Sequence, residues 1–203
     1  MHFIKKINIL LIFSFALAYP TKQDFSNAFI KVAEKGNPTI VSIISKKIIE
    51  NHHHFFFDYG TPNQNKKHQS LGSGVIVDSK NGYIITNNHV IENAEEIKVI
   101  LLDKREIKAE IIATDPPSDI AIIKVEPIGL NSIKMGDSEK LKVGEWIVAI
   151  GSPFGLHLNH TVTAGIISAV GRSAIIDRQN IENFIQHDAA INPGNSGGGL
   201  FNL

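Results

Sequence analysis

The sequence predicts an all-β fold built from two β-rich halves. Short runs rich in Ile and Val recur along the chain at a spacing of about ten residues. Gly, Asn, Asp or Pro lies between most of these runs, as turns require. Helical periodicity is confined to one segment near the N-terminus. Many short strands with almost no helix are typical of a β-sandwich or a pair of barrels, and not of βαβ units.

The composition is that of an ordinary globular protein. Of 203 residues, 43% are hydrophobic and 20% are charged, which argues against long disorder or a fibrous repeat. Lys plus Arg and Asp plus Glu both number 20, so the formal net charge is zero. This balance gives no reason to expect nucleic acid or an anionic membrane surface as a partner. The chain contains no cysteine, which excludes disulfides, cysteine zinc sites and thiol catalysis.

The first 18 residues have the pattern of a signal peptide. Lys5 and Lys6 precede an apolar run from Ile7 to Leu17, and 16–18 reads Ala-Leu-Ala, the small-x-small pattern of a signal-peptidase site. The alternative is an uncleaved anchor, but a spanning helix needs about 20 apolar residues. We therefore expect export to the periplasm, and no integral membrane span once residues 1–18 are removed.

One helix and ten strands are expected in the rest of the chain. In Gln23–Lys35, Phe25, Phe29 and Val32 share one face at helical spacing. The expected strands are Thr39–Ile44, Ser70–Val77, Gly82–Thr86, Ile97–Leu102, Ile107–Thr114, Ile120–Val125, Glu145–Gly151, Thr161–Val170, Phe184–His187 and Gly199–Phe201.

The polar loop 51–69 stands out because it contains three consecutive histidines, His52 to His54, and three consecutive phenylalanines, Phe55 to Phe57. Adjacent residues in an extended chain point to opposite sides, so three histidines in a row do not readily converge on one metal ion. We therefore expect no metal site there. The phenylalanines indicate either an apolar contact surface or packing against the protein's own body.

A serine among glycines is the first candidate for chemistry. Near the C-terminus, Gly194, Gly197, Gly198 and Gly199 surround Ser196. Glycines allow a backbone that points successive N–H groups at one place, where they can stabilise an oxyanion. The plain alternative is a glycine-rich turn. The match to the G-x-S-x-G elbow of α/β-hydrolases fails, because that motif needs a following helix and partners later in the chain.

Partners for Ser196 must therefore come earlier in the sequence. His89 follows the strand-like run 82–86, where a sheet could hold it as a general base. Asp119 begins the apolar strand 120–125, could be buried there and could orient the histidine, whereas Asp115 is better suited to a turn before two prolines. His187, beside Asp188, is a minor rival base. The order His89, Asp119, Ser196 is that of chymotrypsin-type proteases.

With these residues in place, the chain resembles the HtrA/Deg family of exported trypsin-like serine proteases from about Phe25 onward. The segments that carry the resemblance are Ser70–Val77, Gly82–Val90, Asp119–Lys124, Gly136–Ser138, Val143–Gly155, Thr161–Ser168 and Asp188–Leu200.

The resemblance implies a trypsin-like double β-barrel with the active site between the barrels. It implies His89 as general base, Asp119 as its orienting carboxylate and Ser196 as nucleophile, with the N–H groups of Gly194 and Ser196 as the oxyanion hole. It further implies cleavage of unfolded or damaged exported proteins, a homotrimer and no cofactor. Loop 51–69 lies where the family carries a regulatory loop.

The chain also departs from the family pattern. Family members continue after the serine segment with further strands and then PDZ domains, so we expect the second barrel to be incomplete at the C-terminus. Three hypotheses stay open: an active peptidase, a catalytically impaired fragment, and a non-enzymatic binder of unfolded polypeptide. The expected organisation is signal peptide 1–18, helical segment 19–37, first barrel 38–126 with loop 51–69, linker 127–144 and partial second barrel 145–203.

Overall fold

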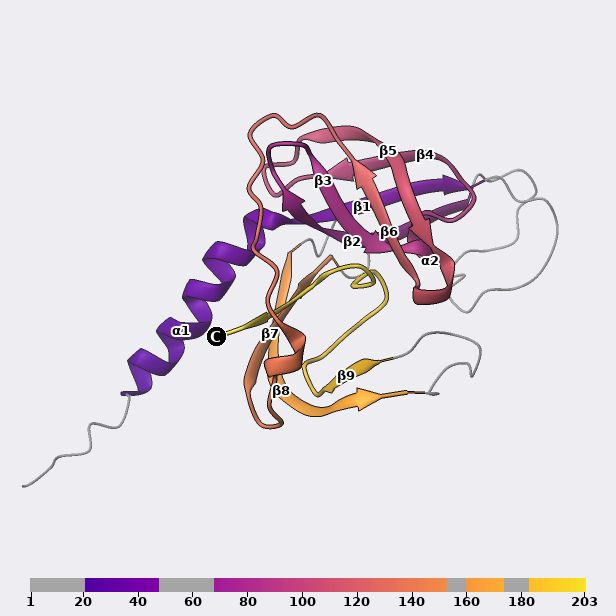
Figure 1. The fold of residues 1–203 in the computed structure, drawn as a ribbon. Helices are drawn as coiled ribbons and strands as arrows, with labels where there is room; N and C mark the ends of the chain where they lie inside the picture. The colour runs from indigo at the N-terminus through magenta and orange to yellow at the C-terminus, as the bar shows by residue number, and fades with distance from the viewer. Residues whose placement is uncertain (1–20, 48–67, 153–159, 174–182) are drawn as a thin grey trace, which may run out of the picture.

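The computed structural model describes residues 21–47, 68–152, 160–173 and 183–203, and in them the expected helix and ten strands are present. Figure 1 shows a barrel and a second sheet, with the N-terminal helix beside them. The helices are α1 (Lys22–Gly36) and α2 (Asn88–Ile91), with short 3₁₀ turns η1 (Asn37–Thr39), η2 (Pro116–Ser118) and η3 (Ser138–Lys140). The strands are β1 (Ile40–Lys47), β2 (His68–Asp78), β3 (Tyr83–Asn87), β4 (Ala94–Ile100), β5 (Glu106–Asp115), β6 (Ile120–Lys124), β7 (Trp146–Gly151), β8 (Thr161–Arg172), β9 (Phe184–His187) and β10 (Gly199–Asn202).

The first six strands close into an antiparallel barrel in the order β1-β2-β3-β6-β5-β4. Its interior consists almost wholly of Ile, Val, Leu and Ala, because alternate residues of each strand face inward. The buried members of this core are Val41, Ile43, Ile76, Ile84, Val90, Ile91, Ile97, Val99, Leu101, Ala109, Ala121, Ile123 and Val125. Closure leaves no free strand edge in the barrel, which makes it a rigid support.

The second half is a four-stranded sheet in the order β10-β7-β8-β9. Its cores are smaller than that of the barrel. One consists of Ile147, Ala149, Ile167 and Ala189. The other is shared with the barrel, since Val148 and Ile150 of β7 pack with Ile40 of β1. Within the described residues the sheet is open, with β10 and β9 at its edges. The predicted all-β architecture in two halves is thus confirmed, with a closed six-stranded barrel and a second sheet.

Helix α1 begins at a capping box and lies against the second sheet. The Thr21 hydroxyl accepts from the Asp24 N–H, and the Asp24 carboxylate accepts from the Thr21 N–H, which satisfies both ends of the first turn. Phe29 packs edge-on against Phe25 and against Trp146 of β7. No helix in the described residues is long and apolar enough to cross a membrane.

The segment between the halves is tied to the first barrel. The Ile133 N–H donates to the Ile76 carbonyl over 3.1 Å, and the Arg105 guanidinium donates to the carbonyls of Ile128 and Gly129. Its one regular element is η3. The domain boundaries expected from the sequence remain a prediction. The signal peptide and most of loop 51–69, with its histidines and phenylalanines, lie outside the described residues.

Two local features differ from the expectation. Strand β1 was expected to end at Ile44, but it continues to Lys47 because Lys46 and Lys47 pair with β2 on one side and β4 on the other. The short helix α2 was not expected at all. Its four residues are too few for periodicity to reveal, and it is stabilised by tertiary burial of Val90 and Ile91 in the barrel core.

Candidate active site

His89 lies on α2, directly after β3, at the rim of the closed barrel. Its neighbours fix the helix: Asn88, Val90 and Ile91 are buried, and the Val90 carbonyl accepts a 2.6 Å hydrogen bond from the hydroxyl of Ser45. The His89 side chain itself is 48% exposed. The imidazole ring of His89 is therefore exposed on a helix whose other three residues are buried.

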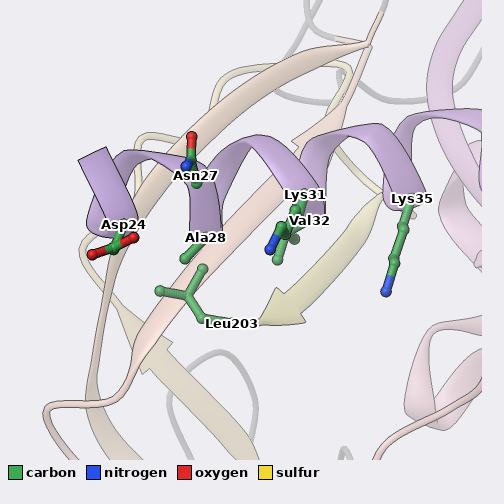
Figure 2. A pocket seen from close by; sticks show the side chains of 7 residues that line it. All are labelled: Asp24, Asn27, Ala28, Lys31, Val32, Lys35 and Leu203. Carbon is green, nitrogen blue, oxygen red and sulfur yellow. The ribbon is translucent and has the colours of Figure 1, made fainter. Parts of the chain in front are cut away.

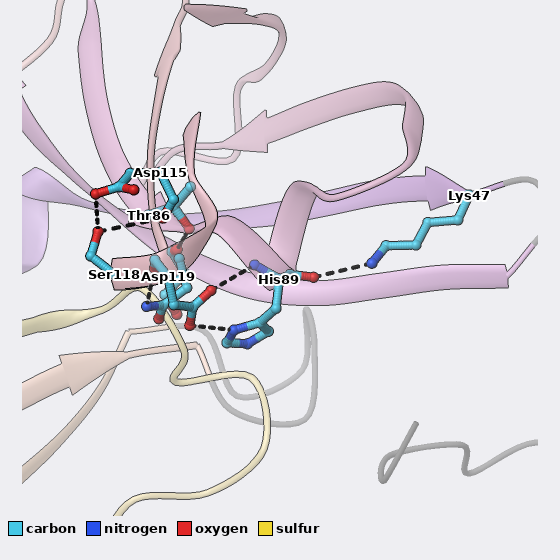
Figure 3. A network of polar contacts seen from close by, with 8 residues as sticks. Lys47, Thr86, His89, Asp115, Ser118 and Asp119 are labelled. Carbon is cyan, nitrogen blue, oxygen red and sulfur yellow. Dashed lines mark hydrogen bonds and ion pairs between the residues drawn. The ribbon is translucent and has the colours of Figure 1, made fainter. Parts of the chain in front are cut away.

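Both carboxylate oxygens of Asp119 contact His89. Oδ1 accepts the main-chain N–H of His89 over 2.9 Å, and Oδ2 lies 2.7 Å from ring Nδ1 (Figure 3). The Asp119 carbonyl accepts from the Asn88 N–H and from the Asn87 side-chain amide. Because a carboxylate only accepts, Nδ1 carries the proton, and Nε2 is left as the basic nitrogen of the ring.

The backbone of Asp119 explains how the carboxylate reaches the histidine. Asp119 follows η2 in the left-handed conformation, with φ 54° and ψ 39°, which aspartate tolerates better than most residues. The expectation that Asp119 could be buried at the start of β6 is wrong, since its side chain is 43% exposed. The left-handed turn stands at the barrel rim, outside the core. Asp115, which was expected in a turn, is instead the last residue of β5 and pairs with Ile120 of β6. Its carboxylate accepts from the hydroxyl of Ser118.

Ser196 lies in a turn between β9 and β10. Gly194 and Gly197 have φ values of 101° and 82°, which only glycine adopts readily. The turn's own backbone hydrogen bonds use the N–H groups of Asn195 and Gly198. Between described residues, the N–H groups of Gly194 and Ser196 form no hydrogen bond. Both predicted oxyanion donors are therefore without a partner among the described residues.

The serine turn is docked on the barrel beside His89. A Cβ added to Gly197 would meet the Ser73 carbonyl at 2.2 Å and the Thr86 hydroxyl at 2.4 Å, and the main-chain N of Asn87 at 3.1 Å. Asn87 precedes α2, so this contact places Ser196 and His89 in the same neighbourhood. In the described part of the chain, no hydrogen bond joins the His89 ring to the Ser196 hydroxyl. Such bonds are often long or absent without substrate.

The rival base His187 is less well placed. It lies in β9, and the Asp188 carboxylate that could orient it instead accepts a 2.7 Å hydrogen bond from the N–H of Ile166. Asp188 also fills the space above Gly165, where an added Cβ would come within 2.3 Å of its Oδ1. The carboxylate thus holds the serine segment against β8 and does not form a second histidine pair.

The pocket beside α1 lies apart from the candidate catalytic residues. A pocket of about 410 Å³ lies between one face of α1 and Leu203, and Figure 2 shows that none of the three catalytic candidates lines it. Among the described residues, no cluster of three or more His, Cys, Asp or Glu side chains could hold a metal ion.

Comparisons with known proteins identify the family of this fold. Residues 72–203 match the family described as trypsin-like peptidase domain. The chain belongs to the trypsin-like peptidase family. Within it, the chain is a member of the HtrA/Deg family, as the resemblance implied.

The HtrA/Deg relatives are named serine endoproteases. A probable periplasmic serine endoprotease DegP-like from Marinomonas sp. is 43% identical over 98% of this chain and 47% of its own length. The periplasmic serine endoprotease DegP of Escherichia coli is 56% identical over 69% of this chain and 29% of its own length. The names place both relatives in the periplasm, in agreement with the predicted localisation. The chain spans about half the length of the first of these relatives and less than a third of the length of the second.

Solved structures agree with this assignment. The structure titled HtrA-type protease AlgW with tripeptide has a TM-score of 0.72 and 36% identity, over 86% of this chain and 50% of that one. A second AlgW structure, with a decapeptide, has a TM-score of 0.70 at 36% identity.

Proposed function

We propose that this chain is a periplasmic serine endopeptidase that cleaves unfolded or damaged exported proteins through His89, Asp119 and Ser196. The observation that carries the proposal is the pair of contacts from the Asp119 carboxylate to His89. One oxygen lies 2.9 Å from the main-chain N and the other 2.7 Å from ring Nδ1, and the Ser196 turn packs nearby. A carboxylate that fixes both the backbone and the ring of one histidine sets its tautomer and its direction, which is what a general base needs.

The proposed reaction begins with attack of the Ser196 hydroxyl oxygen on the peptide carbonyl. As the new C–O bond forms, Nε2 of His89 takes the hydroxyl proton, and the carbonyl electron pair moves onto oxygen. The N–H groups of Gly194 and Ser196 stabilise that oxyanion. Collapse of the intermediate breaks the C–N bond, and His89 gives its proton to the leaving amine. Water then hydrolyses the acyl-enzyme, with His89 again as base. No step requires a metal or cofactor.

The open edges of the second sheet support unfolded polypeptide as the substrate. β10 and β9 are the edge strands of that sheet within the described residues. An extended segment can add to such an edge through main-chain hydrogen bonds, whereas a folded protein presents few free strands. An enzyme that binds main chain in this way selects for lack of structure more than for sequence.

A homotrimer forms part of the proposal. Phe25 of α1 and Trp146 of β7 pack edge to face with ring centroids 5.4 Å apart, yet 44% and 45% of their surfaces are exposed. An exposed aromatic pair of this kind is suited to contact with another copy of the chain. Light scattering with size-exclusion chromatography tests this, and Trp146→Ala is expected to shift the mass toward the monomer.

A non-enzymatic binder of unfolded polypeptide is the less economical alternative, because binding at a strand edge has no need of the His89 and Asp119 pair. The two functions separate in one experiment. The purified chain is incubated with a permanently unfolded protein, reduced and carboxymethylated lactalbumin, and with its native form. We expect fragments from the unfolded protein only, and none with Ser196→Ala. Fragments that persist in that variant would exclude Ser196 as nucleophile. Retention of uncut substrate by the unaltered chain would favour the binder.

A further inference from the structure

Ser73 of β2 connects the first barrel to the serine turn. It is fully buried, with 0% of its surface exposed. Its N–H donates to the Ser196 carbonyl over 2.7 Å, and its hydroxyl donates to the Gly194 carbonyl over 2.8 Å. The same hydroxyl accepts from the N–H of Ser152, over 2.9 Å, just after β7. This one residue of the barrel thus contacts the second half of the molecule through three hydrogen bonds, two of its hydroxyl and one of its main-chain N–H.

The strand pairing explains why Ser73 is free to do this. The β2–β3 ladder begins at Val75, so Ser73 lies beyond it on that side. The Thr86 hydroxyl satisfies the Ser73 carbonyl over 2.7 Å, and the Ser196 carbonyl satisfies its N–H. The serine turn therefore lies beside Ser73 where a longer β2–β3 ladder would have placed β3.

The two carbonyls that Ser73 holds control the orientation of the peptide between them. A peptide unit is planar, so fixing a carbonyl fixes the N–H at its other end. The Gly194 and Ser196 carbonyls belong to the peptide units on either side of the unit that carries the Ser196 N–H. Within the turn, the Asn195 N–H donates to the Asn192 carbonyl and the Gly198 N–H donates to the Asn195 carbonyl. Gly194 and Gly197 have no side chains and adopt positive φ, so they add little resistance to rotation of the flanking units. Ser73 restrains the Gly194 and Ser196 carbonyls from outside the turn.

We propose that Ser73 is a positioning residue for the oxyanion hole, holding the turn so that the N–H groups of Gly194 and Ser196 converge. This inference rests on the proposed function and extends it to a residue that contacts neither the substrate nor the reacting atoms. Its hydroxyl lies in the barrel, which carries His89 and Asp119, and it binds the turn that carries Ser196.

Ser73→Ala is the direct test, because it removes the hydroxyl and leaves the main-chain bond to Ser196. Loss of one direct oxyanion donor lowers the rate by about 10²–10³-fold, so loss of one anchor of that donor should cost about 10-fold. We expect the acylation rate with p-nitrophenyl acetate to fall about 10-fold with KM within about twofold, since the lost restraint matters most in the transition state. The hydrolysis seen with Ser196→Ala is subtracted as background.

Ser42→Ala is the matched control. The Ser42 hydroxyl is equally buried, at 3% exposure, and donates to the hydroxyl of Ser152 over 2.7 Å, one step further along the same network. It does not touch the serine turn. Both variants should lower the unfolding midpoint by similar amounts, but only Ser73→Ala should lose acylation rate. Equal losses of rate in both would reduce Ser73 to a general stability residue and overturn the proposal.

Hydrogen exchange supplies a readout that does not depend on catalysis. In Ser73→Ala, the segment 188–203 should exchange faster than in the unaltered chain, while in Ser42→Ala it should not. Unchanged exchange in Ser73→Ala would refute the anchoring role even if the peptidase is active. Conversely, faster exchange in a chain that never acylates would mean that the proposed function, and not the anchor, has failed.

Discussion

The two halves of the proposed active site are held in different ways. His89 and Asp119 lie on the rim of a closed barrel, have side chains almost half exposed, and are joined by side-chain hydrogen bonds. Ser196 lies on an open sheet with a small core and is held through its carbonyl by the buried Ser73. The closed barrel therefore contacts both halves of the proposed site: it carries the proposed base directly, and it contacts the turn of the proposed nucleophile through one buried serine. Damage to the second sheet should affect the nucleophile alone, whereas damage to the barrel should affect both.

The largest expected effect is on the base. Asp119→Asn replaces an oxygen that accepts from Nδ1 with an amide that can donate to it, which favours the wrong tautomer of His89. We expect kcat to fall about 10⁴-fold, with the unfolding midpoint almost unchanged. Steady-state hydrolysis and a thermal melt measure the two quantities. Asp115→Asn is the control, because its carboxylate accepts from Ser118 and does not reach His89. A loss below 10-fold in Asp119→Asn would mean that His89 keeps its orientation without the carboxylate.

Core substitutions compare the two regions directly. Ile123 and Ile167 are both 0% exposed, the first in the barrel core and the second in the small core of the sheet. Each change to Ala should lower the unfolding free energy by about 2–5 kcal/mol. In Ile167→Ala we expect faster hydrogen exchange in β7–β9 while β1–β6 stay protected. Ile123→Ala should instead loosen both regions. Equal loosening of both regions by Ile167→Ala would show that the barrel does not stand by itself.

Substitution of Lys47 tests how much a contact to the main chain of His89 contributes to kcat. Its ammonium donates to the His89 carbonyl over 3.1 Å, as Figure 3 shows. Burial lowers the pKa of Lys47, and the nearby Glu92 carboxylate partly offsets this, so the ammonium is lost at a lower pH than in a free lysine. For Lys47→Met we expect kcat about threefold lower, since a partly exposed charged hydrogen bond contributes little. Its neighbour Lys46 pairs with Glu96 on β4, so Lys46→Met should leave kcat unchanged. Equal kcat values for the two variants would show that the Lys47 contact with the His89 carbonyl does not contribute to kcat.

The smallest expected effect is a pH dependence of stability that arises from His160, the residue before β8. Burial, and then the positive charge of Lys104, lowers the pKa of His160 below 6.5. Between 6.5 and the lowered pKa, the unfolded chain binds a proton that the folded chain does not, so the unfolding free energy falls as the pH falls. His160→Asn removes the titrating ring and suits the φ of 58°. Between pH 7 and pH 5, the unaltered chain should lose about 2–4 °C more in Tm than the variant. Parallel pH curves would contradict this.

Most of the fold was predictable because strand periodicity and turn residues are local signals. The run of β-branched residues in 40–44 and the glycines around Ser196 indicate a strand and a catalytic turn without any tertiary information. Helix α2 and the last residues of β1 were not predictable in this way. Their stability comes from burial against, or pairing with, strands distant in the sequence.

The candidate site divides along the same line. His89, Asp119 and Ser196 were identifiable from residue type, order and flanking strands. The left-handed turn that exposes Asp119 was not, because it depends on how η2 meets α2. Nor was the role of Ser73, since a serine in a strand reveals its partners only when the chain has folded. The segment Ser70–Val77, which contains Ser73, is one of those that carry the family resemblance, but the sequence gives no reason to assign Ser73 a role.

The central claim is that the closed barrel and the open sheet together assemble one activated serine. Labelling of the purified chain with a fluorophosphonate, followed by intact mass measurement, tests it most directly, because the probe needs the nucleophile, base and oxyanion hole but no specific substrate. The account predicts one adduct per chain, absent from Ser196→Ala. No adduct on the unaltered chain, or an adduct that survives in Ser196→Ala, would contradict it.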